Sequence, residues 1–170
     1  MNTLLALETQ RLNLRQYRLD DAAFIHSVMN DADFIRFIGD RGIVDEASAI
    51  SKVIEPTLSG YKTLGFGMLV VEEKSSGEKV GLAGILKRDF LDYPDLGYAF
   101  AKAGRGKGYA LEATQALMQT AKQQNVADKI VAIVDPANAS SIALLEKLEF
   151  RYENEEVKGI EGPVHLYLHD

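Results

Sequence analysis

The pattern of apolar and polar residues divides the chain into short strands separated by helices and turns. Alternation at Leu12 and Leu14 predicts a first strand, and the near-continuous apolar run at residues 129–134 is typical of a strand buried on both faces. Turn-forming residues at 74–78 separate two β-rich segments and predict a hairpin. The strands predicted in this way cover residues 7–15, 66–73, 79–88, 95–101, 129–134, 151–158 and 164–169.

Apolar residues at helical spacing, with capping residues at the ends, predict four helices. These cover residues 20–29, 45–54, 108–124 and 138–150. In the third helix Ala113, Leu117 and Ala121 share one face, and their small size favours close packing on a sheet. Pro56 is expected to stop the second helix, and Asn125 to end the third in a left-handed conformation. The chain has no repeat or linker, so its 170 residues are predicted to form a single α/β domain with a mixed sheet.

Composition narrows the class of function. The formal net charge of −6 argues against a nucleic-acid backbone as a partner and is compatible with a cationic partner such as an amine. The absence of cysteine excludes a disulfide, a thiolate zinc site and a cysteine nucleophile. No apolar run has the length of a membrane span and no basic leader opens the chain, so we expect a soluble, cytoplasmic protein. His26, His165 and His169 lack metal-ligand spacing, so no metal site is expected.

Two glycines and two cations stand immediately before the third predicted helix, in the segment Arg105-Gly106-Lys107-Gly108-Tyr109-Ala110. Glycine permits positive φ and lets a ligand approach the backbone closely. The first turn of a helix offers unpaired N–H groups and a partial positive charge. These features favour a bound phosphate, although an ordinary helix entry facing solvent would carry the same residues.

Two motifs resemble those of the GNAT N-acetyltransferase superfamily. The family's acetyl-CoA loop reads Gln/Arg-x-x-Gly-x-Gly/Ala, which Arg105, Gly108 and Ala110 match, and its pattern Asn-x-x-Ser followed by Glu-Lys-Leu-Gly-Phe is similar to residues 138–150. The stretches LETQRLNLRQYRLDDA and LGYAFAKAGRGKGYALEA resemble the ribosomal-protein N-terminal (alanine/serine) acetyltransferase branch, so the resemblance covers nearly the whole chain. It implies a mixed, mostly antiparallel sheet that is splayed centrally and flanked by helices.

The sequence departs from the family pattern at two positions. Glu149 stands where the family has a glycine at the end of the last helix, in a place where positive φ is expected. Leu145 stands where many members carry a tyrosine that protonates the departing CoA thiolate. The first departure bears on local stability, and the second leaves the identity of the acid open.

The resemblance implies that acetyl-CoA is the cosubstrate. Its pyrophosphate would lie on the amides of the glycine loop, and its pantetheine arm would meet backbone groups at the end of the strand 95–101. Asn138 is expected both to cap its helix and to contact that arm, whereas Glu112 is interpreted as structural. The residues expected to bind acetyl-CoA are Phe100, Ala101, Lys102, Arg105, Gly106, Lys107, Gly108, Tyr109, Ala110, Asn138 and Ser141.

A protonated amine must lose a proton before it can attack a thioester. Asp95 is the first candidate for the base, because the start of its strand borders the acceptor cleft in the family, and Asp89 and Glu156 are weaker candidates. Each of the three also fits an ordinary surface carboxylate. Tyr152 and Tyr167 either line the acceptor side or only pack.

Ser141 is the candidate for the missing acid. It lies four residues before Leu145 and therefore one helical turn away on nearly the same face, so its hydroxyl could serve the leaving sulfur. The alternative is that the hydroxyl forms a hydrogen bond within the first turn of its own helix.

The resulting hypothesis is an acetyl-CoA-dependent N-acetyltransferase. It moves an acetyl group to a primary amine, on a protein N-terminus or a small molecule, by direct attack in a ternary complex. A non-catalytic CoA-binding or regulatory module of the same fold is the alternative. A generic dinucleotide-binding domain is excluded, because the glycines at 104, 106 and 108 do not complete the G-x-G-x-x-G fingerprint. No nucleic acid or membrane is expected as a partner, and a homodimer is left open.

Overall fold

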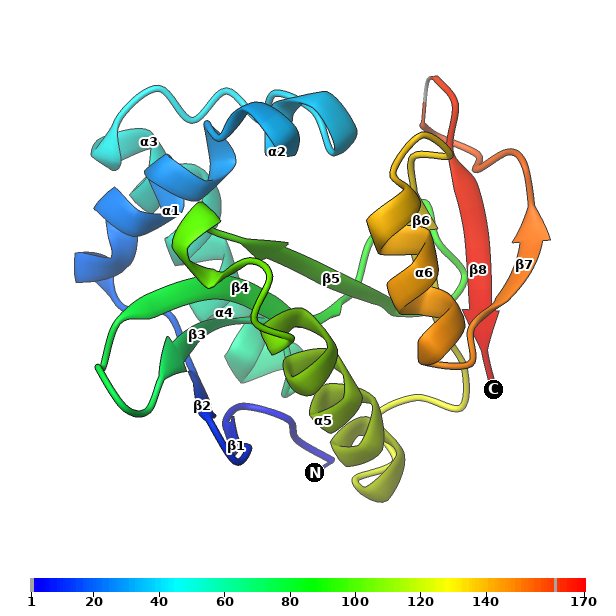
Figure 1. Ribbon diagram of the computed structural model, residues 1–170, viewed down its shortest axis with the longest axis horizontal. Coiled ribbons are helices and arrows are strands. Elements are labelled where there is room, and N and C mark those ends of the chain that lie inside the picture. Colours follow the sequence, from blue (N-terminus) through cyan, green and yellow to red (C-terminus); the bar gives the residue numbers. More distant parts are fainter. Residues whose placement is uncertain (1, 161) are drawn as a thin grey trace.

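Eight strands form one open sheet with the order β1-β2-β3-β4-β5-β6-β8-β7. This computed structural model describes residues 2–160 and 162–170 (Figure 1). Neighbouring strands are antiparallel except for the parallel pair β5 and β6, so the sheet is mixed and mostly antiparallel, as expected. The strands are β1 (Leu7–Glu8), β2 (Leu12–Arg15), β3 (Met68–Glu73), β4 (Lys79–Leu86), β5 (Asp95–Phe100), β6 (Ile130–Val134), β7 (Arg151–Asn154) and β8 (His165–His169).

Helices cover the sheet in two groups. Those between β2 and β3 lie together on the left of Figure 1, whereas α6 lies with β6, β7 and β8 on the right and α5 crosses the front. The α-helices are α1 (Ala22–Met29), α2 (Ala32–Phe37), α3 (Glu46–Ala49), α4 (Glu55–Leu64), α5 (Tyr109–Gln123) and α6 (Ala139–Lys147). Shorter turns are the 3-10 helices η1 (Leu19–Asp21) and η3 (Lys102–Gly104) and the π-helix η2 (Ile50–Ile54).

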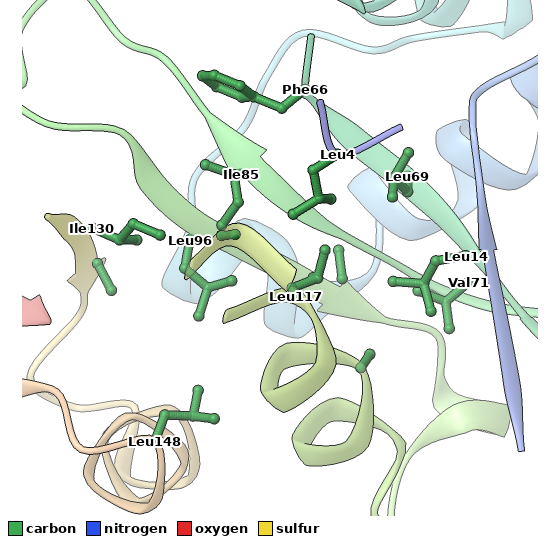
Figure 2. Packing of buried hydrophobic residues seen from close by; sticks show 14 of the residues in the cluster. Leu4, Leu14, Phe66, Leu69, Val71, Ile85, Leu96, Leu117, Ile130 and Leu148 are labelled. Atoms are coloured by element: carbon green, nitrogen blue, oxygen red, sulfur yellow. The ribbon is translucent and has the colours of Figure 1, made fainter. Parts of the chain in front are cut away.

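The central strands are buried on both faces because each face has its own layer of helices. On β3, Leu69 and Val71 point into the core that α5 and α6 cover, whereas Val70 points into the core formed with α1 and α4. Figure 2 shows Leu117 of α5 and Leu148, which directly follows α6, directed into the first of these cores. The alternation of side chains along a strand therefore explains why the β3 sequence MLVVEE is apolar at consecutive positions.

The helix predicted at 45–54 does not stop at Pro56, and this part of the prediction is wrong. The chain passes from α3 through η2 directly into α4, and Pro56 lies in the first turn of α4. A proline in that position needs no N–H donor, and the wider i to i+5 turn of η2 precedes it, where Glu55 N–H donates to Ile50 O. The helix instead ends at Gly65, which has φ 78° and is left-handed.

Three further parts of the chain differ from the sequence prediction. The strand predicted at 151–158 ends at Asn154, so it covers only Arg151–Asn154. Residues 7–15 form two strands rather than one, because the chain turns at Thr9, whose N–H donates to Leu12 O at 2.9 Å. Helix α2 was not predicted at all. Its signals are Asp31, whose side chain caps Asp33 N–H, and apolar residues at helical spacing that include the buried Phe34.

Two helices end in the left-handed turn that the sequence predicted. Asn125 after α5 has φ 49° and Glu149 after α6 has φ 67°. At the second site Glu149 N–H donates to Glu146 O and Phe150 N–H donates to Leu145 O, each at 3.0 Å. This pair of bonds is the Schellman motif, in which glycine is the usual left-handed residue.

Glu149→Gly is expected to raise the free energy of unfolding by ~0.5 to 1 kcal/mol, because a side chain at positive φ is strained and glycine is not. The midpoint of denaturant unfolding at unchanged slope measures the gain. Asn125→Gly is the matched control and should gain less, since asparagine tolerates the left-handed region better than glutamate. A lower midpoint for Glu149→Gly would contradict the strain.

Candidate active site

A cleft opens where β5 and β6 separate. The two strands share a single register pair, Asp95 with Val131, and one bond from Val131 N–H to Pro94 O at 2.9 Å. Beyond that point β5 runs toward α1 and α2 while β6 stays with α6, as Figure 1 shows. The cleft beside β5 has a volume of about 620 Å³ and is lined by residues of α2, β5, the glycine loop, the first turn of α5 and the length of α6.

The open edge of β5 faces this cleft with unused backbone groups. Ala101 N–H donates to Val80 O at 2.9 Å, so odd-numbered residues of β5 bond to β4. Because bonding direction alternates along a strand, the N–H groups of Tyr98 and Phe100 point to the opposite edge, beyond the point where β5 pairs with β6. Backbone groups of Phe100, Ala101 and Lys102 were expected to meet the pantetheine arm. The N–H of Phe100 points to the open edge, whereas the N–H of Ala101 already donates to Val80 O.

The glycine loop has the conformation that its residues predict. Gly106 has φ 72° and Gly108 has φ 80°, and α5 begins immediately afterwards at Tyr109. Gly108 O accepts the first helical bond, from Glu112 N–H at 3.1 Å. The amides before Glu112 therefore have no helical partner, and they sit at the wall of the cleft together with Ala110.

Arg105 lines the cleft and also forms ion pairs with two carboxylates. Its Nη2 lies 2.8 Å from Asp31 Oδ1, its Nη1 lies 3.1 Å from Asp33 Oδ2, and its Nε donates to Phe100 O at 2.9 Å. The hydrogen bond from Arg105 lowers the pKa of Asp31. Arg105, which the sequence analysis assigned to binding of the pyrophosphate, therefore also joins the glycine loop to the start of α2. Lys107 is half exposed, with Nζ 3.8 Å from Glu73 Oε2, and Lys102 is exposed in η3.

Side chains from the turn between β1 and β2 and from α5 hold the glycine loop in place, and we call this group of contacts the clamp. Glu112 accepts hydrogen bonds from Thr9 Oγ1 at 2.6 Å, Arg11 N–H at 3.0 Å and Arg11 Nε at 2.8 Å. Arg11 also donates to Lys107 O at 2.8 Å and lies over the Tyr109 ring, while the Tyr109 hydroxyl bonds to Glu73. Burial opposes ionisation of Glu112, but the bonds from Thr9 and Arg11 outweigh it and lower its pKa. These contacts favour the structural interpretation of Glu112.

Glu112→Ala is expected to lower the free energy of unfolding by about 1 to 2 kcal/mol at pH 7, because a partly exposed carboxylate loses its charged hydrogen bonds. The pKa of Glu112 is lowered in the folded chain, so this contribution is present above its ordinary pKa and is lost as the pH falls. Denaturant midpoints at pH 7 and pH 3 measure both parts. Glu146→Ala, at an exposed site on α6, is the control, and an equal midpoint for the two variants would contradict the clamp.

Asn138 caps α6 as predicted. Its Oδ1 accepts hydrogen bonds from Ser141 N–H at 3.3 Å and from Ser140 Oγ at 3.1 Å. The Ser141 hydroxyl is used differently: it is hydrogen-bonded to the Tyr98 hydroxyl across the cleft, 43 residues away in the sequence. Both Tyr98 and Ser141 line the cleft. Burial raises the pKa of Tyr98 to about 12, although the bond to Ser141 acts in the opposite direction.

Tyr98 is a site residue that sequence reasoning missed. It lies in the strand predicted at 95–101, but its partner Ser141 lies on a distant helix, and nothing in the local pattern couples the two. Leu145, by contrast, is 1% exposed and packs in the core under α6. The side chain at position 145 therefore does not reach the cleft, whereas the hydroxyl-bearing residues Ser141 and Tyr98 line it.

Asp95 is buried at the start of β5, three residues before Tyr98 on the cleft wall. Its side chain is 2% exposed, and its Oδ1 lies 3.2 Å from Arg88 Nε without the alignment of a hydrogen bond. Burial raises the pKa of Asp95 to about 6, and the nearby Arg88 guanidinium limits the rise. A buried carboxylate that titrates near pH 6 can accept a proton at neutral pH, which is the behaviour required of a general base.

The other residues considered from the sequence have less distinctive surroundings. Asp89 and Glu156 are exposed, and Tyr152 stacks edge-on against Tyr167 on the outer strands. Among residues 2–160 and 162–170 no group of three or more His, Asp or Glu side chains could hold a metal ion. In the same described part of the chain, none of the helices is long and apolar enough to span a membrane.

Helix α2 adds an apolar wall that the sequence analysis did not include. Phe34, Phe37 and Ile38 line the cleft opposite Tyr98 and the start of α6. The cleft therefore has apolar residues on one side and hydroxyl and backbone groups on the other. This combination suits a long ligand with both apolar and polar segments.

The family follows from a comparison with known domains. The chain matches the family model described as an acetyltransferase (GNAT) domain over residues 11–151. This chain belongs to the GNAT acetyltransferase family. The resemblance drawn from the two sequence motifs is thereby confirmed, and the protein is an acyltransferase.

Similar proteins agree with this assignment of a GNAT acetyltransferase. The chain is 31% identical over 157 residues to the uncharacterized N-acetyltransferase YjdG of Bacillus subtilis (strain 168), covering 86% of this chain and 90% of that protein. The structure of an acetyltransferase from Agrobacterium tumefaciens str. C58 superposes with a TM-score of 0.84 at 24% identity, covering 99% of this chain and 95% of the other. RimL, a ribosomal L7/L12 alpha-N-protein acetyltransferase in complex with coenzyme A, has the same fold, with a TM-score of 0.82, 16% identity and coverage of 96% and 97%.

Proposed function

We propose that this GNAT acetyltransferase moves an acetyl group from acetyl-CoA to a primary amine by direct attack within a ternary complex. The observation that carries the proposal is the cleft beside the open edge of β5, which is lined by the glycine loop and the first turn of α5. The buried carboxylate of Asp95 lies at the start of the same strand. The chain has no cysteine thiol to carry an acyl-enzyme intermediate, so we propose direct attack with both substrates bound and no covalent intermediate. A cytoplasmic location, which the same composition permits, belongs to this proposal.

The residues of the cleft fit acetyl-CoA. The amides of Gly106 to Ala110 would take the pyrophosphate, because the positive φ of the two glycines leaves the backbone accessible at a helix N-terminus. The free edge of β5 would take the pantetheine arm, and the apolar wall of α2 would exclude water from it. Supplied there, acetyl-CoA contributes an activated thioester.

Each chemical task then has a candidate residue. Asp95 accepts the proton of the acceptor ammonium, directly or through a water molecule, so that the amine nitrogen can attack the carbonyl carbon. N–H groups on the open edge of β5 polarise that carbonyl as its oxygen gains negative charge. The bond from carbon to sulfur breaks and its electron pair stays on sulfur, close to Ser141. Most of the rate would come from holding amine and thioester in this geometry.

The acceptor is proposed as an amine on a peptide N-terminus or on a small molecule. The net charge of −6 favours a cationic acceptor, and RimL, with the same fold, acts on a ribosomal protein α-amine. We would measure release of free thiol from acetyl-CoA against a panel of N-terminal peptides and small amines, with mass spectrometry of the acetylated product. Binding of acetyl-CoA without release on any acceptor would favour the non-catalytic CoA-binding module instead.

A further inference from the structure

A hydroxyl pair bridges the two walls of the cleft. The Tyr98 side chain comes from β5 and the Ser141 side chain from the first turn of α6, and their oxygens are hydrogen-bonded. Ser141 N–H is bonded to Asn138 Oδ1 at 3.3 Å, which fixes the backbone of this turn. Among the described residues the Ser141 Oγ has Tyr98 as its partner, and none within its own helix.

Whether Ser141 donates or accepts in this hydrogen bond determines whether its proton is available to a ligand in the cleft. A hydroxyl has one proton, so Ser141 can donate either to Tyr98 or to a ligand in the cleft. A phenol is the stronger acid of the two and remains protonated at neutral pH in this buried position, which favours Tyr98 as the donor. The serine oxygen then accepts from Tyr98, and its own proton must point elsewhere.

We propose that Tyr98 is a positioning residue that donates to Ser141 Oγ and so directs the serine hydroxyl proton at the sulfur of the departing CoA. This inference rests on the proposed function. Leu145 is buried in the core, so Ser141 supplies the donor that a side chain at 145 does not. As the bond from carbon to sulfur breaks, the electron pair moves to sulfur, the serine hydroxyl stabilises the thiolate, and the thiolate takes a proton from solvent when CoA leaves.

Kinetic constants of three variants test the proposal. Ser141→Ala should lower kcat by about 10- to 100-fold, and Tyr98→Phe by about three- to tenfold, the factor that one neutral hydrogen bond is worth. KM for acetyl-CoA should stay unchanged in both. The double variant should be no slower than Ser141→Ala alone, because Tyr98 acts through Ser141. Tyr93→Phe, at an exposed site in the loop before β5, is the control and should match the wild type.

Losses that multiply in the double variant would overturn the proposal, because they would mean that the two hydroxyls act independently. An unchanged kcat for Tyr98→Phe would overturn it as well. A fall in thermal stability with unchanged kcat in both single variants would assign the pair to packing of α6 on β5.

A binding experiment tests the same proposal without any acceptor. A thiol such as that of CoA loses its proton near pH 8.5, so stabilisation of the thiolate should make CoA bind more tightly between pH 7 and 9.5. Acetyl-CoA has no free thiol and serves as the reference ligand. In calorimetric titrations the ratio of CoA to acetyl-CoA affinity should rise with pH for the wild type and rise less for Tyr98→Phe and Ser141→Ala.

Failure of the proposed function and failure of the role proposed for Tyr98 give different experimental results. A wild type that acetylates no amine overturns the proposed function, whereas the binding ratio still decides whether Tyr98 and Ser141 stabilise a thiolate. Equal pH dependence of that ratio in wild type and both variants overturns the role of Tyr98, whatever the turnover.

Discussion

Replacing Asp95 with asparagine is expected to lower kcat about 100-fold near pH 7, at the lower end of what a general base contributes. The amide cannot take the proton of the acceptor, and an α-amine is mostly protonated below its pKa of about 8. The deficit should therefore shrink as the pH rises and free amine becomes abundant. In the wild type, turnover should increase as the pH rises through about 6, where Asp95 ionises. Profiles of kcat between pH 5.5 and 9.5 measure both effects.

Stability provides an independent check on Asp95→Asn. The pKa of Asp95 is raised by burial from 3.8 to about 6, so the folded chain binds more protons than the unfolded chain between these values. Its ionisation therefore costs stability as the pH rises through this range, and the asparagine variant should be at least as stable as the wild type at pH 8. Asp92→Asn, on the exposed part of the same loop, is the matched control. An equal rate deficit at every pH would indicate that Asp95 positions the acceptor instead.

Gly108→Val is expected to weaken acetyl-CoA binding at least about tenfold, which corresponds to roughly 1.4 kcal/mol. Gly108 has φ 80°, and a Cβ built on it meets Arg11 Nη2 at 3.4 Å. A β-branched side chain disfavours that φ and covers the amides that the phosphate would approach. Calorimetric titration with acetyl-CoA measures the loss.

Gly77→Val is the control that separates a loss of acetyl-CoA affinity from the effect of backbone strain. Gly77 has φ 75° and a Cβ there meets nothing within 4 Å, in a turn outside the cleft. Both variants should lose stability, but only the change at Gly108 should lose affinity for acetyl-CoA. Unchanged affinity in folded Gly108→Val would place the pyrophosphate elsewhere.

Much of the fold could be predicted because its signals are local. The apolar run of β6, the glycines before α5 and the left-handed turn at Glu149 depend on neighbouring residues, and the structure has all three. The error at Pro56 arose because a π turn changes the hydrogen-bond pattern just before the proline, which no local propensity signals. Helix α2 is only six residues long, too short for its periodicity to stand out.

The candidate site was predictable only in part, for a related reason. The glycine loop and the Asn138 cap involve residues close together in the sequence and can be identified from spacing. The bond between Tyr98 and Ser141 and the ion pairs of Arg105 with Asp31 join residues distant in the sequence, and only the folded chain brings them together. The burial of Asp95, which raises its pKa, likewise depends on packing around the strand rather than on its neighbours in sequence.

Alternate side chains of β5 point to opposite faces of the sheet. Leu96 and Phe100 direct their side chains to the α5 core, whereas Ala99 packs on the opposite face with α1 and α4. Asp95 and Ala99 share that second face, because side chains two residues apart point the same way. A substitution at an odd position therefore alters the packing of β5 against α1 and α4, while the side chains on the α5 face stay in place. The insertion of one residue in β5 would exchange the two faces and turn its core side chains toward the wrong helical layer. The number of residues in β5 is therefore constrained by the two helical layers that pack on it.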